Sequence, residues 1–194
     1  MRVSLAFWIA ALLALSSATA RSSGDFTSPQ ESRRAPSPPA NATGSKAAPA
    51  KEKFAEAQRM LGEGALDQAL EEVREGLKLE PRSTEGLNLL GIIYEQQKDY
   101  AQSEAAFKQA LELNPRSTET HNNLGISYVA QKKLDRAERE FASTLGIDPR
   151  DRTANYNMGL VRLAERKPKE AIIFLGRVNR PDPGTQLNLV QAYL

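Results

Sequence analysis

The sequence contains no cysteine and only one histidine, His121, among its 194 residues. Without cysteine the chain forms no disulfide and carries no thiolate metal ligand. One imidazole supplies neither a histidine metal cluster nor a Ser-His-Asp arrangement with a spare histidine. No glycine-rich phosphate loop is present, and Gly62-Glu63-Gly64 reads as a turn between two helices. We therefore expect a protein that is not an enzyme and that has no metal or cofactor.

Neither sign of charge dominates the sequence, in which 26 lysine and arginine residues face 24 acidic ones. A global attraction to nucleic acid is therefore not expected, and no aromatic residues alternate with the basic ones to stack on bases. Some basic residues gather toward the C-terminal end, which indicates either a docking patch for an acidic partner or an ordinary charged surface. They are Arg150, Arg152, Arg162, Arg166, Lys167, Lys169, Arg177 and Arg180.

An almost unbroken apolar run follows Arg2 at the N-terminal end, from Val3 to Leu15. Small residues come next, and Ala18-Thr19-Ala20 fits the A-x-A cleavage pattern, so we predict a signal peptide over residues 1–20. The alternative is an uncleaved anchor, since the 18 positions from Val3 to Ala20 are at the lower limit for crossing a bilayer. Cleavage predicts an exported protein, periplasmic or extracellular, with no stable membrane span.

Residues 21–49 are rich in serine, proline, alanine and glycine and include one large apolar residue, Phe26. Such a segment buries too little surface to offset the entropy of ordering the chain. It is predicted to be a disordered linker between the signal peptide and a folded domain at residues 50–194.

A proline returns at an interval of 34 residues, at Pro81, Pro115, Pro149 and Pro183. The flanking residues repeat too, because Glu-Pro-Arg-Ser-Thr-Glu at 80–85 comes back as Asn-Pro-Arg-Ser-Thr-Glu at 114–119. An interval of this length indicates stacked helix-turn-helix units. Each proline is expected to end the second helix of its unit, since proline lacks a backbone donor.

Apolar and small residues recur at offsets of three and four within each interval, which is the pattern of two amphipathic helices. Gly91, Gly125 and Gly159 are expected to let paired helices approach closely. Phe107 and Phe141 are expected to fill the seam to the next pair.

These positions resemble the tetratricopeptide repeat, whose pattern runs Leu-Gly-x-x-Tyr, then Ala, Phe, Ala and Pro. Gly91 and Tyr94 match it in one unit, and Gly125 and Tyr128 match it in the next. The resemblance implies an all-α fold, a right-handed α-solenoid of about four helix-turn-helix repeats plus a C-terminal half repeat. The units would cover residues 50–83, 84–117, 118–151 and 152–185, with a partial fifth unit at 186–194.

Two residues depart from this pattern. Arg162 replaces the tyrosine of the fourth unit, and we expect a looser or more exposed helix end there. His121 takes the fourth position of its unit, where the family has a large packing residue, so the resemblance implies a partly buried structural role.

The first helix of each unit lines the concave face in this family, and the resemblance implies that certain positions point into a peptide-binding groove. In this sequence they are Asn88, Ile92, Glu95, Asn122, Ile126, Val129, Tyr156, Leu160 and Leu163, with Phe54 in the first unit. The asparagine side chains would bind a peptide backbone, and the apolar end would hold an amphipathic helix or an extended segment. The alternative is that the isoleucines and leucines pack between neighbouring units.

The segment from Leu187 to Leu194 reads as the first helix of a fifth unit, within which the sequence stops. Leu187 and Val190 do not supply the polar outer face that a cap needs, which indicates a truncated sequence or a partner that completes the stack.

The leading interpretation is an exported adaptor or scaffold that binds a peptide or helix of another exported protein. One alternative is the N-terminal recognition region of a longer enzyme. The other is a structural protein that self-associates through the C-terminal half repeat.

Overall fold

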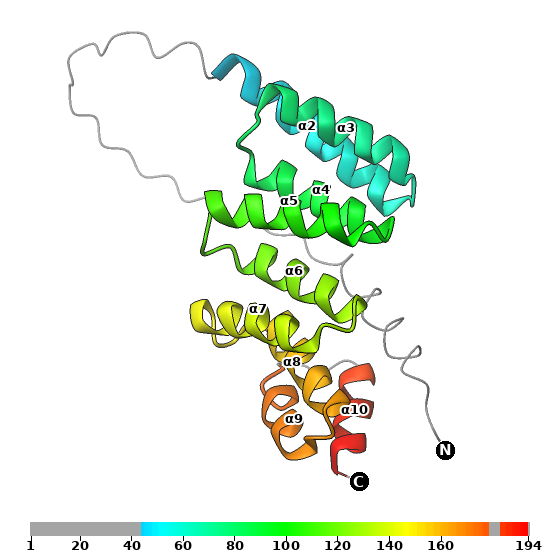
Figure 1. Ribbon diagram of the computed structural model, residues 1–194, viewed down its shortest axis with the longest axis vertical. Helices are drawn as coiled ribbons and strands as arrows, with labels where there is room; N and C mark the ends of the chain where they lie inside the picture. Colours follow the sequence, from blue (N-terminus) through cyan, green and yellow to red (C-terminus); the bar gives the residue numbers. More distant parts are fainter. Residues whose placement is uncertain (1–43, 179–182, 194) are drawn as a thin grey trace, which may run out of the picture.

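The computed structural model describes residues 44–178 and 183–193, and all regular structure in these ranges is helical. Figure 1 shows the helices stacked in chain order along the long axis of the molecule. The predicted all-α solenoid is therefore confirmed. Its helices are α2 (Gly44–Gly62), α3 (Leu66–Leu79), α4 (Thr84–Gln96), α5 (Tyr100–Leu113), α6 (Thr118–Ala130), α7 (Leu134–Ile147), α8 (Arg152–Ala164), α9 (Pro168–Leu175) and α10 (Pro183–Tyr193).

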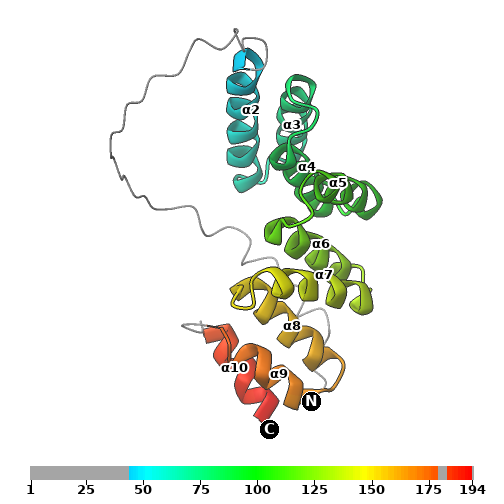
Figure 2. The same ribbon diagram turned by 90° about the vertical axis from the view of Figure 1, so that its left-hand side faces the viewer.

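The helices form two layers. Helices α2, α4, α6, α8 and α10 are the first helices of their units, and each contacts the next first helix along the chain. Helices α3, α5, α7 and α9 are the second helices, and each packs between its own first helix and the following one. Figure 2 shows that the stack curves, with the first helices on its hollow side. We call this side the concave face and the layer of second helices the convex face.

The interval of 34 residues recurs in the backbone at both ends of the first helices. Side-chain oxygens of Ser83, Ser117 and Asp151 each accept a hydrogen bond from the backbone N–H three residues later, which caps α4, α6 and α8. After each first helix the chain enters the left-handed region, with φ of 76° at Gly64, 64° at Lys98, 61° at Lys132 and 61° at Arg166. The same cap and the same turn therefore position every complete unit.

Glycine lets the two helices of a unit touch. A Cβ at Gly91 would lie 2.5 Å from Cε1 of Phe107, and a Cβ at Gly125 would lie 2.5 Å from Cε1 of Phe141. Leu175 takes the place of the phenylalanine against Gly159. Phe107 also packs in one core cluster with Leu124 and Tyr128 of the next unit, so the expected close approach and the expected seam are both confirmed.

Phe54 on α2 is a correction to the sequence analysis, which places it in the groove. It is fully buried in the core of the first unit. Its ring fills the space beside Gly76 and Gly86, where a Cβ on Gly86 would lie 2.6 Å from Cε1 of the ring. The large residue of this unit is therefore on its first helix and the glycine on its second, the reverse of the later units.

Two boundaries also differ from expectation. Helix α2 begins at Gly44, inside the predicted linker, and Ala50 is already fully buried in the core. Pro183 does not end a second helix, because α9 ends at Leu175 and Pro183 is the first residue of α10. Proline is well placed at the start of a helix, where its missing N–H has no partner to lose. The predicted signal peptide and most of the predicted linker lie outside the described residues.

No helix in the described part of the chain is both long and apolar enough to span a bilayer.

Candidate functional site

The two asparagines predicted to hold a peptide backbone are already bonded within the protein. Asn88 on α4 is 5% exposed, and its Nδ2 donates to Oε1 of Glu119 on α6 at 2.8 Å. Its Oδ1 accepts from Nδ2 of Asn123 at 3.2 Å. Both ends of the Asn88 amide therefore join α4 to α6.

Asn122 on α6 repeats half of this arrangement. Its Nδ2 donates to Oδ1 of Asp151 at 3.0 Å, and Asp151 also caps α8 through the backbone N–H of Ala154. Its Oδ1 is buried and has no hydrogen-bond partner within the described residues, and the same holds for Oδ1 of Asn157 on α8. Two buried amide acceptors are thus left unsatisfied on adjacent first helices, which is an arrangement that native proteins seldom keep without a reason.

The predicted apolar positions belong to the core and to the surface together. Tyr156 and Leu160 on α8 are only 7% and 8% exposed. Ile126 and Val129 on α6 are half-buried and pack against both the central and the C-terminal core clusters. Half-buried Ile92 and Leu163 pack against one core cluster each. The packing between units that was the alternative therefore exists, and Ile92, Ile126, Val129 and Leu163 still expose part of an apolar side chain.

Glu95 stands at the last turn of α4 and is the predicted acidic residue of the concave face. Burial raises the pKa of its carboxyl above the ordinary value of 4.5. A carboxyl in this state gives up its proton less readily, and it can donate or accept a hydrogen bond according to the pH.

Arg162 is a second correction, because the end of α8 is not loose. Its side chain is only 11% exposed and forms ion pairs with Glu138, Glu165 and Glu170. Glu138 lies on α7, so the pairs join the second helix of one unit to the first helix of the next. Burial opposes the charge on Glu165, but hydrogen bonds from Arg162 and Lys167 outweigh it and lower the pKa of Glu165.

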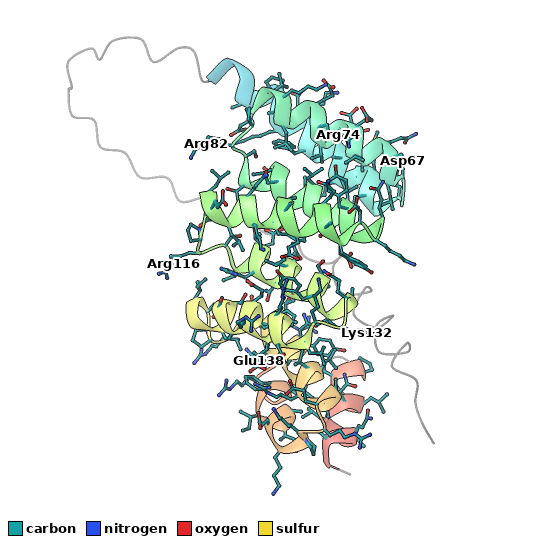
Figure 3. The ribbon with its side chains drawn as sticks, in the orientation of Figure 1. Asp67, Arg74, Arg82, Arg116, Lys132 and Glu138 are labelled. Atoms are coloured by element: carbon teal, nitrogen blue, oxygen red, sulfur yellow. The ribbon has the colours of Figure 1, made fainter. Side chains whose placement is uncertain are left out.

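These ion pairs divide the basic residues that gather toward the C-terminal end. Arg162 and Lys167 are bound to Glu165, so they are not free to form a docking patch. Figure 3 shows Arg82 and Arg116 projecting from one edge of the solenoid and Lys132 lying toward the opposite edge. The exposed cations of the described chain are thus spread over two edges and do not cover the concave face.

His121 has the partly buried structural place that its position implies. Its Nδ1 lies 2.8 Å from Oε2 of Glu140 on α7, and its Nε2 lies 3.1 Å from the backbone oxygen of Pro115. Within the described ranges no group of three or more His, Cys, Asp or Glu side chains is placed to hold a metal ion.

The sequence matches family models of the tetratricopeptide repeat over residues 84–117 and 106–139. No curated protein sequence gives a significant match to the chain. Many solved structures share its fold. PilF of Pseudomonas aeruginosa superposes with a TM-score of 0.72 and 21% identity, over 76% of this chain and 69% of PilF.

Two further structures illustrate the range of proteins with this fold. The first tetratricopeptide-repeat domain of Spaghetti (RPAP3), bound to the HSP90 peptide SRMEEVD, has a TM-score of 0.58 and 19% identity, over 62% of this chain and 95% of the domain. A mutant O-GlcNAc transferase of Thermobaculum terrenum has a TM-score of 0.63 and 21% identity, over 67% of this chain and only 25% of the enzyme. The chain therefore carries tetratricopeptide repeats over residues 84–139 and folds as an all-α repeat solenoid, an architecture of protein–protein interaction scaffolds.

Proposed function

We propose that this protein is a non-enzymatic adaptor that binds a peptide or a helix of another protein on its concave face. The observation that carries the proposal is the combination on α6 of half-buried Ile126 and Val129 with the unsatisfied Oδ1 of Asn122. Apolar anchors beside a backbone acceptor suit an extended segment or an amphipathic helix. The peptide in the RPAP3 structure supports a peptide as the class of ligand.

The bonded state of Asn88 and Asn122 narrows how binding would work. Asn88 uses both ends of its amide to join α4 to α6, so it would hold the wall of the groove in shape. Asn122 keeps a free acceptor, and a small rotation of its side chain would present this acceptor to a backbone N–H of the ligand. The apolar side chains of Ile126, Val129 and Leu163 would then supply most of the affinity, because burial of apolar surface is the main attraction.

Selection of peptides from a displayed library on the full-length chain tests this proposal. Peptides enriched on the wild type should lose binding to Val129→Asp, which places a charge on the concave face. They should keep binding to Ala142→Asp, which places the same charge on an exposed site of α7 on the convex face. Equal binding to both variants, or no enriched peptide, would contradict a concave binding surface.

We also propose that the adaptor is exported and that its partner is another exported protein, because residues 1–20 have the pattern of a cleavable signal. Sequencing the N-terminus of the mature protein from the producing cell tests export. Cleavage after Ala20 gives a chain that begins at Arg21. An intact Met1 in a cytoplasmic fraction would contradict export without affecting the groove.

A recognition region of a longer enzyme remains a second proposal, supported by the solenoid shared with the much longer O-GlcNAc transferase. The complete reading frame decides it, because this proposal requires a catalytic domain encoded after Leu194.

A further inference from the structure

Helix α10 is apolar on two sides. On one side Thr185, Asn188 and Ala192 are buried. On the other side Leu187 and Val190 are 66% and 55% exposed, and with Ile173 of α9 they are the large exposed hydrophobic residues of the described chain. We call the surface formed by Leu187 and Val190 the α10 outer face.

A repeated hydrogen bond fixes the register of α10 in the stack. Asn188 donates from Nδ2 to the hydroxyl of Tyr156 on α8 at 3.3 Å. Asn123 on α6 donates in the same way to Asn88 on α4. Val190 follows Asn188 by two residues as Gly125 follows Asn123, so Val190 takes the place that glycine has in the earlier first helices.

This valine decides which helices can cover the α10 outer face. At Gly125 the space of a side chain is taken by the ring of Phe141, which would lie 2.5 Å from a Cβ. Val190 fills the same space with its own methyl groups. A second helix like α5 or α7, with a phenylalanine at this point, therefore cannot dock on α10 as it docks on α4 or α6. This excludes a covering helix exchanged from the middle units of another copy.

Charge excludes a second arrangement. The sequence of α10, Pro-Gly-Thr-Gln-Leu-Asn-Leu-Val-Gln-Ala-Tyr, contains no charged residue. At the other end of the solenoid, α2 exposes Lys51, Glu52 and Arg59. Head-to-tail stacking of copies would press these charged groups against Leu187 and Val190 and remove them from water at a large cost. An uncharged apolar face is best matched by another copy of itself.

We propose that two copies of this chain associate tail to tail, with the α10 outer face of one against the α10 outer face of the other about a two-fold axis. The contact is self-complementary and closed, so it stops at a dimer. One short helix from each copy buries far less than the roughly 1,200 Å² of a stable interface, and the dimer is accordingly weak and concentration-dependent. The concave face stays open in this dimer, which therefore carries two grooves.

Sedimentation velocity of the full-length chain, from micromolar to near-millimolar concentration, tests the proposal. The wild type is expected to shift from the mass of one chain toward the mass of two. Leu187→Glu and Val190→Glu each place a charge in the contact and are expected to remain monomeric. Ala142→Glu adds the same charge on an exposed site of α7 and is expected to behave as the wild type. Circular dichroism of each variant confirms that its helices are intact.

A mixture of two variants gives the sharpest arm. Leu187→Glu and Leu187→Lys are each expected to be monomeric, and their equimolar mixture is expected to recover a dimer because opposite charges meet across the axis. A wild type that stays monomeric throughout overturns the proposal. Association that survives both glutamate variants arises elsewhere in the chain and overturns it too, as does growth beyond two copies. None of these results depends on the concave face, which Val129→Asp tests separately.

Discussion

The guanidinium of Arg162 on α8 donates two hydrogen bonds to the carboxylate of Glu138 on α7, with Nη1 at 3.0 Å from Oε2. Arg162 stands where the two preceding units have Tyr94 and Tyr128. The partner has also been kept in place, since Glu104 is the equivalent of Glu138 and a hydrogen bond to Glu104 adds to the burial that raises the pKa of Tyr128. Arginine therefore replaces the tyrosine by using the same acidic position of the preceding second helix.

Removing Glu138 tests this replacement. Glu138→Ala leaves the mostly buried guanidinium of Arg162 with only its own unit's carboxylates, and we expect a loss of about 1–2 kcal/mol in the free energy of unfolding, as for hydrogen bonds to charged groups. Urea denaturation measures it. Glu112→Ala, at an exposed site of α5, is the matched control and should stay within about 0.5 kcal/mol of the wild type. Equal stability of the two variants would show that Arg162 does not hold the units together.

The pH dependence of stability tests the environment of Glu95. Burial raises the pKa of this carboxyl in the folded protein, so the folded state binds the proton more tightly than the unfolded state does. The contribution of Glu95 to stability is therefore present below the ordinary value of 4.5 and is lost as the pH rises through the raised pKa. Glu95→Gln stays neutral and should gain stability relative to the wild type across that window. A difference between the two proteins that is constant with pH would contradict the assignment.

Glycine packing gives a prediction of opposite outcomes at two positions. Gly125→Leu should cost about 1–3 kcal/mol by overpacking, because its Cβ would lie 2.5 Å from Cε1 of Phe141. Gly146→Leu, near the end of α7, meets nothing within 4 Å and should be neutral or stabilising by up to about 1 kcal/mol. Thermal unfolding of the two variants measures both effects. Unchanged melting of the Gly125 variant would mean that the repeat register is wrong.

The turn after α2 can be tested with two glycines that are two residues apart. Gly64 has a φ of 76°, which an alanine adopts only with strain, so Gly64→Ala should lose about 1 kcal/mol. Gly62 ends α2 and has open space around it, and Gly62→Ala should be neutral or slightly stabilising. Chemical denaturation compares them. A loss at Gly62 with none at Gly64 would contradict the left-handed turn.

The repeated units were predictable from the sequence because one interval fixes many contacts at once. Gly91 and Gly125 face their phenylalanines as expected, since residue size alone decides which side chain fills the space between two helices. The interval misleads where a unit changes its length or exchanges its large and small residues. Pro183 keeps the interval yet starts α10, because α9 has only 8 residues. Phe54 is buried because the glycines beside it lie on α3 and α4.

The candidate site was predictable only in part, because residue type does not show whether a polar group is already bonded. Asn88 and Asn122 have the side chains that a peptide backbone needs, but their partners Glu119 and Asp151 lie about thirty residues further along the chain. Only folding brings them together. The partner of Arg162 could have been found from the sequence, since Glu104 and Glu138 are 34 residues apart and stand at matching places on α5 and α7.

Site-specific photo-crosslinking in the producing cell tests the central claim most directly, that partners bind the concave face. A photoreactive amino acid replaces Val129 on the concave face in one strain and Ala142 on the convex face in another. We expect a crosslinked partner from position 129 that is absent from position 142. Crosslinking only from position 142, or equally from both positions, would contradict the account.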